Sequence, residues 1–131
     1  MSSKNIIDSM ATKFDAEWNK VLYPIEWPNV PKRFNTVPYV RFSVVFFESV
    51  NAVVGGAKQR RSGLIVISIF IDANAGYGLG YSIGDDVMTV FQNQQFSNIF
   101  TYAGTTKEVG KDLLNSNLYM LNAEIPFESV N

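Results

Sequence analysis

The sequence contains no cysteine and no histidine among its 131 residues. Without cysteine, the chain can form neither a disulfide framework nor a thiolate metal site or nucleophile. Without histidine, it lacks the commonest general base and the commonest ligand of transition metals. A hydrolase would then need a serine and lysine dyad, for which no motif is visible. We therefore expect a protein that is not an enzyme, with no catalytic residue, no cofactor and no metal.

Net charge is also close to absent. Eleven basic and twelve acidic residues give a formal charge of −1, so the field that drives nonspecific nucleic-acid binding is missing and any contact with DNA must be local. The N-terminal stretch MSSKNIIDSMATKFDAEW carries acids and no continuous apolar run. This argues against a signal peptide and a membrane span, and it predicts a soluble protein that is intracellular where it is made.

Two helices are predicted within one domain, residues 1–131, whose 47% hydrophobic content can supply a real core. Apolar residues at three- and four-residue steps predict the first helix over about 4–21, with Ser2 or Ser3 at its start. Prolines then favour an extended connector. Ser82 and Asp85 resemble a capping box, which predicts the second helix over about 83–92.

Four strands are expected, because apolar residues also recur at every second position in several stretches. The predicted strands begin at Pro38 and cover 64–71, 98–103 and 118–127. Together with the helices they predict an α+β fold, a mostly antiparallel sheet of about four strands with two helices packed on one face.

The segment ESVNAVVGGAKQRRSG between the first two strands predicts a long hairpin with a flexible, basic tip. Such a cluster is either a solvated loop that keeps a sheet edge from pairing or a local contact for an acidic partner surface or a DNA phosphate. The candidate partner-binding residues are Lys58, Gln59, Arg60 and Arg61.

A glycine run follows the second strand in the stretch IDANAGYGLGYSIGDD. Gly76, Gly78 and Gly80 give G-x-G-x-G, which is not the G-x-G-x-x-G of a dinucleotide-binding turn. We interpret these glycines as a structural turn from strand to helix, because glycine adopts positive φ without penalty. A small-ligand or nucleotide-binding module using this loop is the alternative from a different functional class.

Three acids near the glycine run, Asp72, Asp85 and Asp86, could be imagined as oxygen ligands of a divalent cation. The preferred interpretation is electrostatic, because acids in the first turn of a helix interact favourably with its dipole. We therefore expect no metal there.

Aromatic residues are abundant, with ten Phe, six Tyr and two Trp. These exceed what one modest core requires, and aromatic side chains are enriched where protein surfaces meet. The first strand is also apolar on both sides and so needs cover on both. We therefore predict a homo-oligomer in which a neighbouring subunit supplies the second cover. The two faces of that strand carry Phe42, Val44 and Phe46, and Tyr39, Val45 and Phe47.

The order of these elements resembles that of the tail terminator (tail completion) proteins of long-tailed bacteriophages, over nearly the whole chain. The resemblance includes the amphipathic first helix, the structural turn Trp27, Pro28 and Asn29 in EWPNVP, and the basic-tipped hairpin. It continues through the strand and glycine exit RSGLIVISIFIDANAGYG and the helix SIGDDVMTVF. It implies a small α+β domain that forms a hexameric ring, stops polymerisation of the tail tube at its head-proximal end and provides the head–tail joining surface.

The resemblance further implies partners and a location. The partners would be other copies of the chain, the tail tube protein and a head–tail connector protein, with DNA in the lumen as a local contact and no membrane. The location would be the virion tail, and the host cytoplasm during assembly. Only the turn at 27–29 and the hairpin residues 58–61 carry over individually. Another neck or head–tail completion protein is the neighbouring alternative.

Overall fold

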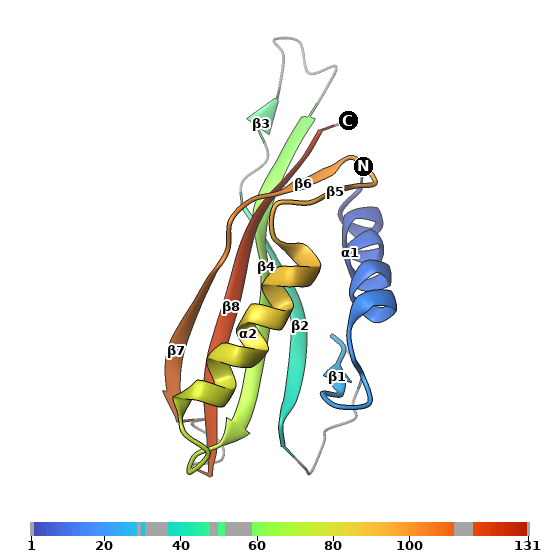
Figure 1. Cartoon of the computed structure of the whole chain (residues 1–131). Helices are drawn as coiled ribbons and strands as arrows, with labels where there is room; N and C mark the ends of the chain where they lie inside the picture. Colours follow the sequence, from blue (N-terminus) through green and yellow to red (C-terminus); the bar gives the residue numbers. More distant parts are fainter. Residues whose placement is uncertain are drawn as a thin grey trace.

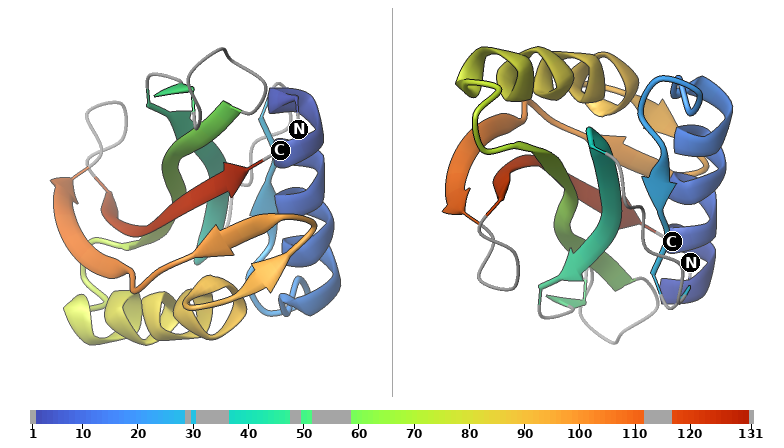
Figure 2. Two further views of the ribbon diagram at one scale, coloured as in Figure 1. Left: turned by 90° about the horizontal axis from the view of Figure 1, so that it is seen from above. Right: turned by 90° about the horizontal axis from the view of Figure 1, so that it is seen from below.

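The computed structural model describes residues 2–28, 30, 37–47, 50–51, 59–111 and 117–130. Within them one sheet is covered on one face by two helices (Figures 1 and 2). The elements are α1 (Ser3–Glu17), β1 (Ile25–Glu26), β2 (Tyr39–Phe46), β3 (Val50–Asn51), β4 (Gln59–Asp72), α2 (Tyr77–Phe91), β5 (Gln95–Phe96), β6 (Ile99–Thr101), β7 (Thr105–Lys111) and β8 (Leu118–Val130).

The centre of the sheet is β4, which pairs antiparallel with β2 on one side and with β8 on the other. The sheet order is β1-β2-β4-β8-β6-β5, with β3 added to β4 and β7 added to β8. Four isoleucines alternate along β4 and point to one face, where each is at most 1% exposed. Branched side chains at this spacing favour a strand and fill the core beneath the helices. They are Ile65, Ile67, Ile69 and Ile71.

The predicted sheet of about four mostly antiparallel strands is wrong. The described sheet has eight strands and is mixed, because β1 runs parallel to β2. Strands β1, β3 and β5 span only two residues each, too few for an alternating pattern to register, while β6 lies within the predicted strand 98–103. Strand β7, TTKEVGK, is largely exposed and has no apolar face to detect. The α+β class itself agrees with the structure.

Helix α1 starts as expected and ends earlier. The backbone N–H of Asn5 donates to the Ser2 side-chain oxygen at 3.1 Å, so Ser2 is the N-cap. The predicted end near residue 21 is wrong, because the helix stops at Glu17 and Trp18 adopts an extended conformation. There the Trp18 indole N–H donates to the Tyr23 carbonyl at 2.9 Å, which holds the following turn.

Helix α2 begins at Tyr77, six residues before the predicted start. Its N-cap is Gly76, at φ 81°, and no side chain caps it. The predicted capping box at Ser82 is therefore wrong, and of the three glycines assigned to the turn, Gly78 and Gly80 lie inside the helix. Gly80 permits close packing on the sheet, because a Cβ there would lie 2.4 Å from Leu121 Cδ1.

Both helices pack on the isoleucine face, around which the sheet curves (Figure 2). An aromatic cluster joins them, because the Phe14 ring of α1 lies 5.4 Å from Phe91 of α2 and 6.1 Å from Phe42 of β2. Trp18 and Trp27 extend this cluster. Much of the aromatic excess therefore has an internal role. None of the helices in the described residues has the length and apolar character needed to cross a bilayer.

Candidate partner-binding surface

The face of the sheet opposite the helices, here called the outer face, carries no helix in the described part of the chain (Figures 1 and 2). Alternation assigns to it every second residue of β2, β4 and β8. Phe70 is covered there, because it stacks on Tyr39 at 4.8 Å and lies under the Arg41 guanidinium. The half of the outer face near the start of β4 instead carries exposed hydrophobic side chains.

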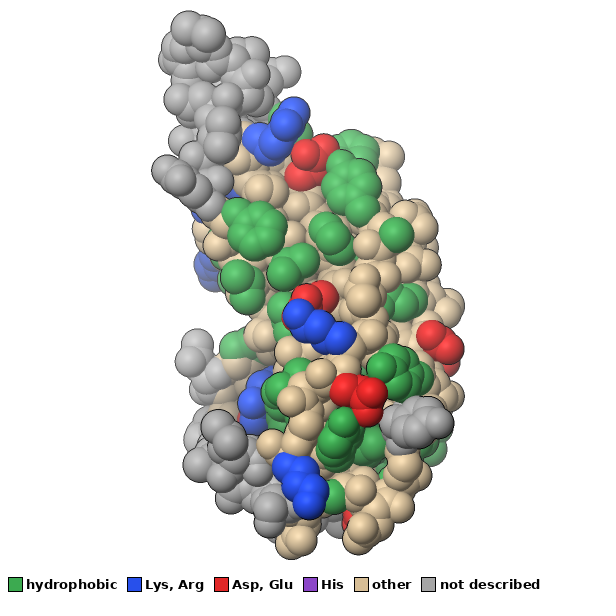
Figure 3. Space-filling model, turned by 90° about the vertical axis from the view of Figure 1, so that its left-hand side faces the viewer, with side chains coloured by type: hydrophobic (Ala, Val, Ile, Leu, Met, Phe, Trp, Pro, Cys, Tyr) green, Lys and Arg blue, Asp and Glu red, His purple; other side chains and the backbone are tan. Residues whose placement is uncertain are grey.

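Four of the eight large hydrophobics exposed in the described residues gather at that end. The strand pairings place Val45 beside Leu64 and Leu64 beside Pro126. Phe47 N–H bonds the Ser62 carbonyl, and Phe100 pairs with Glu128 in the adjoining row. Figure 3 shows hydrophobic side chains exposed between charged ones on the side where β7 lies. We call this group the outer band, and it consists of Val45 (47% exposed), Phe47 (52%), Phe100 (37%) and Tyr102 (46%).

Charges on the outer face are paired with one another. Lys107 Nζ lies 3.1 Å from Glu124 Oε2, and Arg60 Nε lies 3.6 Å from Glu128 Oε2. Tyr102 donates to Glu128 Oε1 at 2.7 Å, a hydrogen bond that with partial desolvation raises the pKa of this phenol. Exposed ion pairs of this kind contribute at most ~1 kcal/mol each.

The predicted basic tip is only partly described. Gln59, Arg60 and Arg61 belong to strand β4 and not to a loop, while Lys58 lies outside the described residues. The two arginines point to opposite faces, as neighbours in a strand must. Arg60 lies on the outer face at the band, whereas Arg61 reaches across the inner side to the Ser3 hydroxyl. The structure therefore separates the cluster and leaves Arg60 beside the outer band.

The predicted turn at 27–29 is described at Trp27 and Pro28, and Asn29 lies outside the described residues. The Val30 N–H donates to the Trp27 carbonyl at 3.4 Å, which closes the segment as a turn. The Trp27 ring packs against Phe42 at 5.4 Å. Trp27 therefore packs against the hydrophobic core.

A hollow of about 250 Å³ lies beside Gly76 and is the place where the loop alternative would hold a ligand. Its lining includes the carboxylates of Asp72 and Glu108. Such a wall repels a phosphate, which argues against nucleotide binding there. Glu108 is already engaged, because Tyr119 donates to it at 2.7 Å and Tyr81 at 3.4 Å. Among the described residues, the acids near the loop do not form a group of three that could hold a metal ion.

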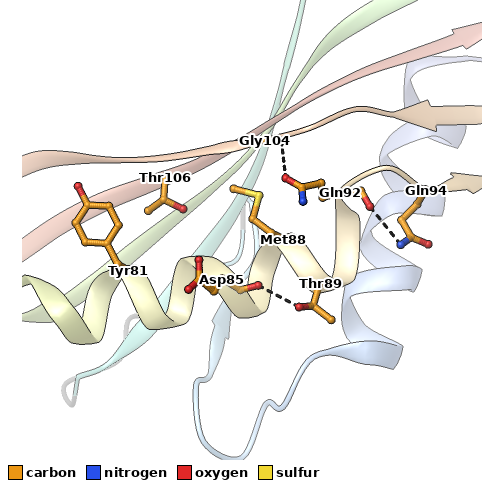
Figure 4. Close-up of a pocket in the computed structure, with 8 residues that line it drawn as sticks. All are labelled: Tyr81, Asp85, Met88, Thr89, Gln92, Gln94, Gly104 and Thr106. Carbon is orange, nitrogen blue, oxygen red and sulfur yellow. Dashed lines mark hydrogen bonds between the residues drawn. The ribbon is translucent and has the colours of Figure 1, made fainter.

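A larger polar groove of about 620 Å³ runs between α2 and β7 (Figure 4). Its polar groups bond locally, since Gln92 accepts from the Gly104 N–H at 2.9 Å and Thr89 donates to the Asp85 carbonyl at 3.1 Å. Its lining holds one carboxylate and no partner base for it. The described lining therefore presents no acid–base pair within hydrogen-bond reach of each other. It is lined by Tyr81, Asp85, Met88, Thr89, Gln92, Gln94, Gly104 and Thr106.

Comparison with known proteins gives a likeness of fold. No family model matches the chain, and no curated protein matches it. A component of the virion of a native gene transfer agent particle superposes with a TM-score of 0.63 at 12% identity, over 95% of this chain and 93% of that one. A second solved structure, which bears no functional name, superposes with a TM-score of 0.71 at 13% identity, over 98% and 96%. Both share the fold over at least 95% of this chain.

Part of the outer band was visible in the sequence and part was not. The two-sided apolar pattern of β2 indicated that Val45 and Phe47 need cover. Phe100 and Tyr102 carried no such signal, because β6 spans three residues and Tyr102 follows it in a loop. Only the pairing of β6 with β8 brings these aromatics to the same end of the face.

Proposed function

We propose that this protein is a tail terminator, a structural component of a phage-type virion. In this role, copies of the chain form a ring, and the resemblance to tail terminators implies six copies in it. The ring sits at the head-proximal end of the tail tube, where it stops polymerisation and offers the surface that joins the head.

The observation that carries the proposal is the full-length likeness to a component of a gene transfer agent virion, with a TM-score of 0.63 over 95% of this chain. That likeness concerns fold, and the order of sequence motifs independently resembles tail terminators. The fold likeness therefore supports a virion component, and the motif order supports the finer role of tail terminator.

The distribution of surface also supports the proposal. The outer band is exposed on a face that a ring neighbour can cover, while a structural adaptor needs no reactive centre. A monomer with a face of this kind is typical of a subunit that buries it on assembly. Closed rings form through such contacts when the two contacting surfaces differ.

The test is a tube-capping assay. Purified tail tube protein is polymerised with and without this protein, and tube lengths are measured by negative-stain electron microscopy. The proposal expects shorter tubes with an added ring at one end, and overlong tails in particles whose copy of the gene is deleted. Unchanged tube length together with binding to the head connector alone would replace this proposal with the neighbouring role of a neck protein.

A further inference from the structure

A second exposed apolar site lies on the helix side of the molecule, in the turn that follows α1. Val21 is 97% exposed and Leu22 57%. The turn is nevertheless held in place, because the Leu22 N–H donates to Asn19 Oδ1 at 3.2 Å and the Tyr23 N–H donates to the Asn19 carbonyl at 3.0 Å. A fixed turn presenting two apolar side chains is preorganised for contact, which lowers the entropy cost of binding.

The surroundings of this turn are acidic. A hollow of about 240 Å³ beside Leu22 includes Glu17 and Asp86 in its lining. Asp86 and its neighbour Asp85 are the sole charged residues of α2, and neither has an ion pair within the described residues. Glu17 is paired with Lys13 at 2.5 Å. The unpaired charge beside the turn is therefore negative.

The outer band is bordered by the opposite charge. Arg60 is 56% exposed, and its 3.6 Å approach to Glu128 is long for an ion pair. The guanidinium can therefore face an incoming carboxylate without giving up a strong partner. Apolar side chains beside a cation on one face thus match apolar side chains beside a carboxylate on the other.

We propose that the turn at Val21 and Leu22 of one copy docks on the outer band of the next copy, with Arg60 facing the neighbour's Asp86. The two surfaces lie on opposite sides of the sheet, so each copy offers both. Such a heterologous contact repeats from copy to copy and can close into a ring. This contact deepens the proposed function and rests on it.

Cysteine cross-linking tests the contact directly, since the chain has no cysteine of its own. The variants Val21→Cys and Phe47→Cys are mixed with tail tube protein and mildly oxidised. Because each chain carries one cysteine, a disulfide between the two variants joins two copies. We expect the 21–47 product in at least tenfold excess over the product of the matched pair Val21→Cys and Val109→Cys. Val109 is a suitable control because it is as exposed (51%) as Phe47 (52%) and lies outside the band.

Charge reversal gives a second measure. Arg60→Glu and Asp86→Arg should each raise the concentration needed for assembly about tenfold, the effect of roughly 1.4 kcal/mol lost at a contact. The double variant should return to within about threefold of the wild type, because the reversed pair attracts again. Thermal unfolding of each variant checks that the fold is retained.

The outcomes separate the contact from the function. Rings that form without the 21–47 disulfide, or reversals that the double variant does not rescue, overturn this contact and leave the tail terminator proposal standing. A wild-type chain that never assembles, even with tube protein present, overturns the proposed function itself.

Discussion

The two faces of β4 differ in what covers them, although both are largely apolar. On the inner face the four alternating isoleucines of β4 are at most 1% exposed beneath α1 and α2. On the outer face the residues between them alternate toward a surface without a helix in the described chain, and at one end of it Phe47 and Tyr102 are about half exposed. A strand apolar on both sides thus has one cover built into its own chain. We propose that the other face, which carries no helix in the described residues, is covered by a partner.

The largest difference between the two faces is expected when a buried side chain of the inner face is shortened. Ile67→Ala should lower the free energy of unfolding by about 2–5 kcal/mol, because it leaves a cavity in a site that is fully buried. Val66→Ala, the adjacent residue on the outer face, is the matched control and should cost less than half as much. Urea unfolding of both variants measures the difference. Equal losses would show that the two faces are packed alike.

The second test concerns the backbone that supports the outer band. A Cβ at Gly63 would lie 2.0 Å from the Val45 carbonyl oxygen, so Gly63→Ala must shift β2 against β4. We expect a loss of about 1–3 kcal/mol, as for overpacked sites. Gly78→Ala is the control, because a Cβ there meets nothing within 4 Å and lies in α2, where alanine favours the helix. Thermal unfolding should move in opposite directions for the two variants.

The sequence predicted those helices and strands whose apolar residues recur at a regular spacing. The isoleucines of β4, the alternation of β8 and the stripe of α1 were all sufficient to locate their elements. The start of α2 was missed because Gly78 and Gly80 disfavour helices in isolation, and close packing on Leu121 overrides that preference. The two-residue strands β1, β3 and β5 were missed because pairing with β2, β4 and β6, not their own pattern, makes them strands.

The candidate surface was predictable to a smaller extent. The basic cluster was identified from charge alone, but its division between two faces depends on Gln59–Arg61 lying in a strand. Asp85 and Asp86 were weighed as cation ligands and interpreted as dipole partners in a helix's first turn, and that placement is wrong, because α2 begins at Tyr77 and has no acid in its first turn. Nothing in the sequence brings these two acids near Val21 and Leu22. That proximity depends on how α1 packs beside α2.

A third test sharpens the separation of the two arginines. Arg60→Glu and Arg61→Glu should each change the free energy of unfolding by less than ~0.5 kcal/mol if the side chain acts on the surface only. We expect this for Arg60→Glu, together with weaker tail assembly. Arg61→Glu should lower the free energy of unfolding somewhat more, because the Arg61 guanidinium bonds the Ser3 hydroxyl at the start of α1. Chemical denaturation and tail yield are measured in parallel. Normal tails with Arg60→Glu would reduce this residue to a solvated side chain.

The smallest expected effect is a pH dependence at the β7 edge. The pKa of Tyr119 is raised above 10.0 chiefly by its hydrogen bond to Glu108, and that of Tyr81 chiefly by desolvation and the Glu108 charge. A raised folded pKa gives stability that is complete below pH 10 and is lost as pH rises through the folded values. Glu108→Gln removes the charge and should reduce this alkaline loss. Phenolate absorbance titrations of folded and urea-unfolded protein measure both pKa shifts.

The central claim is that the outer face of the sheet is a contact between copies of this chain. Native mass measurement across a range of concentrations, with and without tail tube protein, tests it most directly. The account predicts a closed ring, present alone or formed when tube protein is added, and its loss when Val45 of the outer band is replaced by aspartate. A mass that corresponds to a single chain under every condition would contradict it.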